Sequence, residues 1–125
     1  LGKKTEKKNS YSSDGIIPNI KGGKFVEGEF EKSLPKFFSK KRPVASLINF
    51  DADLYDSTLC ALKNCKSIID NKTLLIFDEF IMNENWEKDE FRALNEFCKT
   101  YKFQYQVIAV CLFSQQVAVK IEKHK

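Results

Sequence analysis

The sequence has little of what several common kinds of site require. Its single histidine, His124, is the penultimate residue, and none of its four cysteines form a Cys-x-x-Cys pair. A structural zinc site with the usual Cys and His ligands is therefore not expected. No apolar run reaches the roughly 18 residues that cross a membrane, and residues 1–10 lack the apolar stretch of a secretion signal. We expect no membrane partner.

What the sequence does have is the composition of one folded domain. Its 125 residues are 42% hydrophobic and include 11 phenylalanines, enough for one core but few for a second. Cys60 and Cys98 fall on apolar helical faces, so we expect buried free thiols there. Widely spaced unpaired thiols are typical of a reducing compartment, and the expected location is the cytoplasm.

Positive charge is concentrated in the first third of the chain. The net charge is +4, and residues 1–42 hold 11 Lys or Arg against 5 Asp or Glu. We interpret this excess as solvated surface and terminus. A nucleic-acid partner is not expected, because no aromatic residues interleave with these lysines as single-strand binding requires.

Hydrophobic periodicity predicts an α/β fold. The chain divides into a basic tail and loop at 1–23, a domain at 24–121 and a tail at 122–125. Strands are expected at 24–27, 44–50, 74–77, 105–112 and 116–121, and helices at 29–40 (divided by Pro35), 57–69 and 84–101. This alternation predicts a doubly wound sheet with strands buried on both faces and an antiparallel hairpin at its end.

Acidic residues follow two of the predicted strands. Asp51 and Asp53 come after the strand at 44–50, and Asp78 and Glu79 come after the strand at 74–77. Ligands of open α/β sheets bind beyond the carboxyl ends of the strands. If these strands are neighbours, the four acids meet there, and a Mg²⁺ or Ca²⁺ ion would relieve their repulsion. The alternative is that they are loop and helix-capping acids.

A second group of acids opens the last predicted helix. We interpret these residues as favourable charges at a helix N-terminus. They are Glu84, Glu87, Asp89 and Glu90.

Five segments, taken in order, resemble one enzyme family. They are "FVEGEFEKSLPKF" at 25–37, "LINFDADLYDST" at 47–58, "LLIFDEF" at 74–80, Trp86 with "EFRALNEF" at 90–97, and "QVAVKI" at 116–121. Together they resemble the C-terminal portion of a class I S-adenosylmethionine-dependent methyltransferase of the macrocin O-methyltransferase (TylF-like) family. The resemblance implies a Rossmann-like methyltransferase sheet ending in the antiparallel hairpin.

The resemblance also implies roles for the acids. Asp51, Asp78 and Glu79 would bind a divalent metal, Mg²⁺ or a similar cation. Asp53 would be the general base that takes the proton from the acceptor hydroxyl, and the acceptor would be a sugar or another small molecule. One departure is Glu79, where relatives often carry Asp.

A larger departure is the absence of the glycine-rich turn with which such enzymes bind S-adenosylmethionine. None of the five glycines forms a Gly-x-Gly after a strand. We therefore expect the cofactor site to lie mostly outside this chain, the first strands of the sheet to be missing, and the chain alone to be catalytically inactive. Missing strands would leave an exposed sheet edge, through which the chain would associate with its other half or with a second copy.

Two alternatives belong to other classes of protein. Asp51 and Asp53 after a strand are similar to the nucleophile and general acid of haloacid-dehalogenase-like Mg-dependent phosphatases. Against this, Tyr55 stands where that family has Thr or Val, and a helix is expected at once instead of a flap. The other alternative is a non-catalytic interaction module.

Overall fold

Four strands form one sheet in the order β1-β2-β4-β3. They are β1 (Leu47–Phe50), β2 (Leu74–Phe77), β3 (Phe103–Cys111) and β4 (Gln116–Lys123). The computed structural model describes residues 14–123, so most of the basic tail and His124 lie outside the described residues. Strands β1 and β2 are parallel, whereas β4 runs antiparallel to both β2 and β3. The predicted α/β class and the C-terminal antiparallel hairpin are confirmed.

Three helices connect and flank these strands. They are α1 (Phe30–Phe38), α2 (Tyr55–Cys65) and α3 (Glu90–Tyr101), with short 3-10 turns at Lys66–Ile68 and Trp86–Lys88. Helix α3 ends where Lys102 adopts a left-handed conformation (φ 56°) and its amide donates to the carbonyls of Cys98 and Lys99. This closure satisfies carbonyls that the helix end leaves free.

The core lies between the helices and one face of the sheet. Alternate strand residues point to this face, as in any pleated strand, and they pack on Leu62 of α2 and on Leu94 and Phe97 of α3. The strand residues are Phe50, Leu75, Phe77, Val117, Val119 and Ile121. Phe50 and Phe77 are register partners on the two parallel strands and stack with ring centroids 4.9 Å apart.

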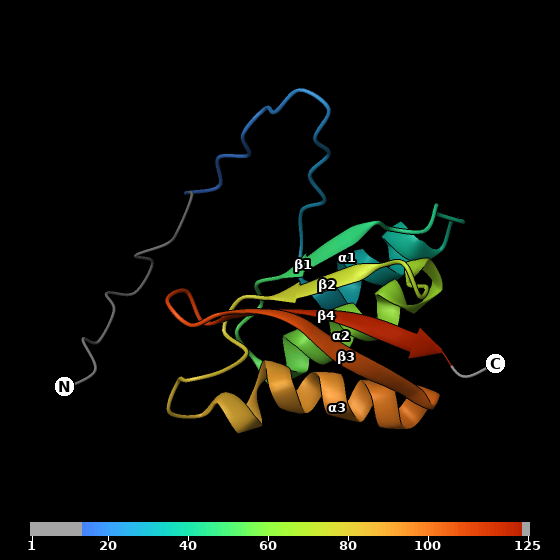
Figure 1. Ribbon diagram of the computed structural model, residues 1–125. Coiled ribbons are helices and arrows are strands. Elements are labelled where there is room, and N and C mark those ends of the chain that lie inside the picture. Colours follow the sequence, from blue (N-terminus) through green and yellow to red (C-terminus); the bar gives the residue numbers. More distant parts are fainter. Residues whose placement is uncertain (1–13, 124–125) are drawn as a thin grey trace.

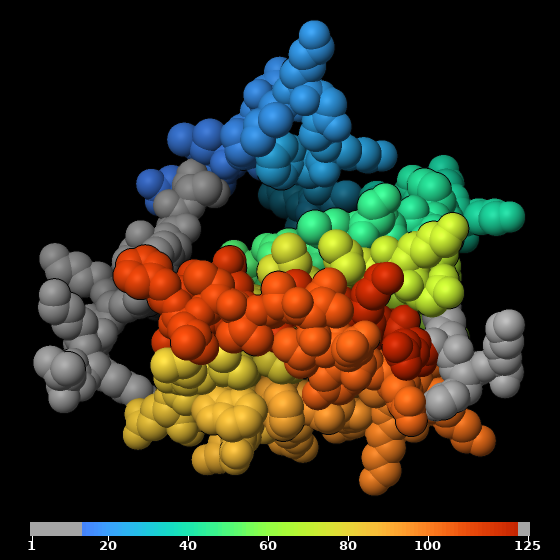
Figure 2. Space-filling model, in the orientation of Figure 1, coloured from blue at the N-terminus to red at the C-terminus, as the bar shows by residue number. Residues whose placement is uncertain are grey.

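The opposite face of the sheet is not covered by any of the described helices (Figure 1). Figure 2 looks onto it, with β2, β4 and β3 at the front. Leu47 on this face is 51% exposed, and Ala109 and Cys111 are exposed as well. The prediction that strands are buried on both faces is therefore wrong for the described residues, where helices lie on one side only. An apolar run predicts a buried strand, but it does not say which elements cover it.

Several element boundaries also differ from the predictions. Residues 24–27 form no strand, because no neighbouring strand pairs with them. Pro35 lies inside α1 without dividing it. Strand β4 continues to Lys123, two residues beyond the predicted end of the domain, because Gln104 and Phe103 of β3 pair with Glu122 and Lys123.

Two further observations concern the exposure of the cysteines and the length of the helices. All four cysteines are free thiols; Cys65 and Cys98 are buried, Cys60 is half-buried and Cys111 is exposed. Burial raises the pKa of both the Cys65 and Cys98 thiols to about 11. Among the described residues, no helix has the length and apolar character needed to span a membrane.

Candidate functional site

The parallel strands β1 and β2 end side by side. Phe50 pairs with Phe77 at the last position of the ladder, and the Asp78 amide donates to the Phe50 carbonyl at 3.0 Å. The chains of both strands therefore leave the sheet at the same edge, as the sequence predicted. Asp51 is exposed just after β1, and Asp78 is half-buried just after β2.

Asp53 stands in a tight turn between β1 and α2. The Leu54 amide donates to the Ala52 carbonyl at 2.6 Å, which closes a three-residue turn around Asp53. Asp53 itself has φ 57°, in the left-handed region that residues other than glycine seldom adopt, although Asp and Asn enter it more readily than most. Its exposed side chain is thus held on an unfavourable backbone at the edge of the sheet.

Asp78 is held by a residue of the last strand. Because β4 begins where β2 ends, Gln116 lies beside Asp78, and its Nε2 donates to Asp78 Oδ1 at 2.5 Å. Glu79, the next residue, is exposed, and its carbonyl accepts a bond from Asn83 Nδ2 at 3.1 Å. The two consecutive acids therefore have different environments.

Glu90 is a fifth acid at this edge, and it is fully buried. Its Oε2 accepts a hydrogen bond from the Glu79 amide at 3.2 Å. Burial raises the pKa of Glu90 to about 7; the nearby backbone amides of Glu79 and Ala52 oppose this rise, whereas the charges of Asp53 and Asp78 add to it. Glu90 lies in the first turn of α3, as predicted, but its side chain is buried.

Tyr55 of the "DADLYDST" segment links two helices. Its hydroxyl donates to Glu96 Oε2 at 2.5 Å, and the Arg92 guanidinium lies 4.1 Å from the centre of its ring. The hydrogen bond to Glu96 is the main cause that raises the pKa of Tyr55. Tyr55 therefore fixes the start of α2 against α3, directly behind the turn that carries Asp53.

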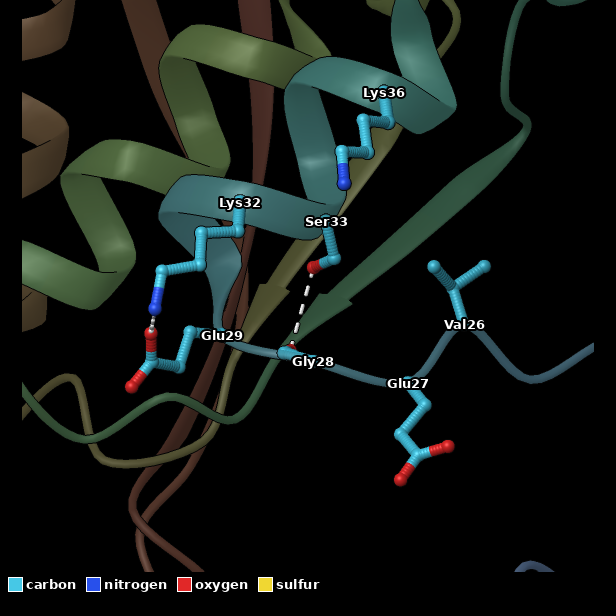
Figure 3. Close-up of a pocket in the computed structure, with 7 residues that line it drawn as sticks. All are labelled: Val26, Glu27, Gly28, Glu29, Lys32, Ser33 and Lys36. Atoms are coloured by element: carbon cyan, nitrogen blue, oxygen red, sulfur yellow. Dashed lines mark hydrogen bonds and ion pairs between the residues drawn. The ribbon is translucent and has the colours of Figure 1, made fainter.

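Surface hollows lie beside the start of α1. One of about 440 Å³ (Figure 3) lies where Lys32 pairs with Glu29 and the Ser33 hydroxyl donates to the Gly28 carbonyl at 3.3 Å. A second hollow of about 320 Å³ shares Gly28 and Glu29 with it and extends to Ala52. The turn that carries Asp53 therefore borders a space open to a small molecule.

A divalent metal ion would need several oxygen ligands that converge on one point. Among residues 14–123, no three Asp, Glu, His or Cys side chains gather in a way that could hold a metal ion. Asp78, one of the predicted ligands, is instead engaged by Gln116. The described arrangement does not support the Mg²⁺ site, and the roles of Asp51, Asp78 and Glu79 as ligands stay predictions.

The fold of the chain is similar to part of one solved structure. It is similar to the apo structure of CalS11, a TDP-rhamnose 3'-O-methyltransferase and an enzyme in calicheamicin biosynthesis, with a TM-score of 0.59 and 21% sequence identity. The similarity covers 76% of this chain but only 40% of that enzyme. No family model and no curated protein matches the sequence.

The sequence did not predict that Glu90 and Gln116 lie at this edge of the sheet. Glu90 shares helical spacing with Leu94 and Phe97, which are both buried, so its position on the buried face was a usable signal. No sequence pattern indicated a role for Gln116, because its approach to Asp78 depends on β4 pairing with β2, and the two residues are 38 positions apart in sequence.

Proposed function

We propose that this chain supplies the acceptor-binding and base-bearing part of an S-adenosylmethionine-dependent O-methyltransferase. The observation that carries the proposal is Asp53, which is held in a strained turn at the carboxyl ends of two adjacent parallel strands, next to Ala52, which lines a hollow. Ligands of such sheets bind at this edge. The likeness of the fold to a sugar O-methyltransferase and the segment "DADLYDST" support the same proposal.

In the proposed reaction, Asp53 is the general base. Its carboxylate accepts the proton of the acceptor hydroxyl while the hydroxyl oxygen forms a bond to the methyl carbon and the carbon–sulfur bond of the donor breaks. The products are a methyl ether, S-adenosylhomocysteine and protonated Asp53. S-adenosylmethionine supplies a methyl group already activated on a sulfonium, so much of the acceleration would come from placing the two reactants in line.

Metal dependence belongs to the hypothesis that the sequence resemblance implies, and no step above depends on it. The hypothesis assigns Asp51, Asp78 and Glu79 as ligands of Mg²⁺ or a similar cation. In the described geometry the Asp78 carboxylate is bonded to Gln116, so binding an ion there would require that bond to break.

The acceptor is proposed to be a hydroxyl of a sugar or another small molecule. CalS11 is named for TDP-rhamnose, and the hollow beside Ala52 measures about 320 Å³, within the range of small-molecule pockets. Its lining includes Glu29, Glu31 and Ser57, which offer hydrogen-bond acceptors to the hydroxyls of a sugar.

The proposal is tested by measuring first the binding of an acceptor and then methyl transfer. Nucleoside diphosphate sugars are titrated into ¹⁵N-labelled chain, and we expect amide shifts at 51–53 and 78–79. Methyl transfer from isotopically labelled S-adenosylmethionine is then assayed. In any preparation that transfers the methyl group, Asp53→Asn should lower kcat for methyl transfer by about 100-fold or more, which is on the order of the effect of a general base.

The matched control is Asp56→Asn, which removes an exposed acid three residues away on the first turn of α2. Asn tolerates the left-handed backbone nearly as well as Asp, so a loss of kcat in Asp53→Asn reflects the missing carboxylate and not misfolding. Amide shifts confined to surfaces far from the strand ends would contradict the proposal. So would release of phosphate from an aryl phosphate, which is the activity of the phosphatase alternative.

A further inference from the structure

Helix α2 begins directly after the turn that carries Asp53, and Leu54 belongs to both. The Leu54 amide donates to the Ala52 carbonyl at 2.6 Å and closes the turn. Its carbonyl accepts from the Thr58 amide at 2.9 Å, which is the first hydrogen bond of α2. Because the turn and the helix share this peptide, a shift of the start of α2 also moves Asp53.

The residue at the N-cap position of α2 does little to fix the start of this helix. Leu54 stands there, and its side chain makes no capping hydrogen bond. Ser, Thr, Asp or Asn would accept from an amide of the first turn, whereas leucine is among the least favoured residues at this position. Leu54 is also 64% exposed, so burial does not anchor it either. The contacts of the next residue, Tyr55, therefore matter more for where the first turn lies.

Tyr55 makes two contacts with α3. Its hydroxyl donates to Glu96 Oε2 at 2.5 Å, and the Arg92 guanidinium, one helical turn away, lies 4.1 Å from the centre of its ring. A hydrogen bond to a carboxylate is stronger than one between neutral groups, and the cation adds its attraction to the ring. Helix α3 is itself anchored, because Leu94 and Phe97 are fully buried. Tyr55 thus ties the start of α2 to a fixed part of the core.

We propose that Tyr55 is a positioning residue whose hydrogen bond to Glu96 holds the first turn of α2, and with it the left-handed turn at Asp53, in place. A positive φ such as the 57° of Asp53 persists where the surrounding structure constrains it. Phenylalanine would fill the same space as Tyr55, so the hydroxyl is the group that this role requires. Its relevance to the general base rests on the proposed function, but the coupling between the hydrogen bond and the turn does not.

The coupling is tested by NMR on the full chain. The three-bond coupling between the amide and α protons of Asp53 reports its φ, and the hydrogen-exchange rate of the Leu54 amide reports the closure of the turn. In Tyr55→Phe, the Leu54 amide should exchange about 5-fold faster or more, as expected for the loss of one hydrogen bond, and the Asp53 coupling should change. Glu96→Leu should reproduce both effects. Glu96→Gln, whose side-chain carbonyl still accepts from the hydroxyl, should stay within about 2-fold of the original exchange rate.

The matched control is Tyr105→Phe. It also removes a tyrosine hydroxyl that donates to a side chain of α3, since Tyr105 on β3 bonds to Asn95 Oδ1 at 3.3 Å. This variant should leave both readouts unchanged. If circular dichroism shows that Tyr55→Phe does not fold, Glu96→Leu decides the result. The proposal is overturned if either readout is unchanged in the deciding variant, if Tyr105→Phe has the same effect, or if Glu96→Gln acts as strongly as Glu96→Leu.

This experiment uses no cofactor, acceptor or metal. A failure to detect methyl transfer would count against the proposed function and leave the NMR result intact. A turn that is unchanged in Tyr55→Phe would refute the coupling and leave Asp53 available as a base. The two proposals therefore stand or fall separately.

Discussion

Two acids near the ends of β1 and β2, Asp53 and Glu90, occupy energetically unfavourable positions. Asp53 has a positive φ, which costs a residue with a side chain on the order of 1 kcal/mol. Glu90 is a buried acid with one oxygen that has no partner among the described residues. A sequence optimised only for stability would place glycine at the first position and leucine at the second. The presence of both acids is what makes this edge a candidate site.

The raised pKa of Glu90 predicts a dependence of stability on pH. Its ordinary pKa is 4.5 and its folded value is about 7, so between these values the folded chain binds more protons than the unfolded chain. The free energy of unfolding therefore falls as pH rises from about 4.5 to 7, by on the order of 3 kcal/mol at most. Asp53 and Asp78 face Glu90 and add to the effect.

Urea denaturation at pH 5 and pH 8, with reductant for the free thiols, measures this dependence. Glu90→Gln has no proton to release, so its loss of stability between the two pH values should be smaller than that of the original chain. Glu87→Gln serves as control and should follow the original chain. Parallel pH profiles for Glu90→Gln and the original chain would refute the assignment.

At the scale of elements, α1 contains a defect that its neighbours tolerate. Pro35 lies within α1, where it has no amide to donate to the Glu31 carbonyl. The sequence predicted a break there, yet the helix continues because Leu34 and Phe38 pack against the core. Tertiary packing thus overrides a local preference.

Replacing this proline should stabilise the helix. Pro35→Ala restores a backbone hydrogen bond and should raise the free energy of unfolding by about 1 to 3 kcal/mol, less than the full difference in propensity because proline also restricts the unfolded chain. Chemical denaturation checks this value. Lys36→Ala, at the exposed neighbouring position, should change it by less than about 0.5 kcal/mol. An unchanged or lower stability in Pro35→Ala would show that α1 is already strained elsewhere.

At the scale of the whole molecule, the described sheet has helices on one face only. The other face presents Leu47 at 51% exposure together with Ala109 and Cys111 of β3. The outer edge of β1 has no neighbouring strand among the described residues. Exposed apolar surface and a free strand edge both favour association.

We therefore expect the chain to self-associate at micromolar concentration. Sedimentation velocity should show a larger species that grows with concentration, and Leu47→Lys should reduce it, because a buried lysine at the contact is unfavourable. Met82→Lys makes the same change at an exposed position on the loop after β2 and should have no effect. A monomer at all concentrations would contradict this prediction.

The sequence by itself determined the class of fold, the hairpin and the placement of acids after two strands, because hydrophobic period and strand length are local properties. Leu74–Phe77 was predicted with its observed bounds for this reason. Only the tertiary structure decided that Gln116 meets Asp78 and that one face of the sheet is open. These facts depend on which strands pair across long stretches of chain, and no local pattern encodes that pairing.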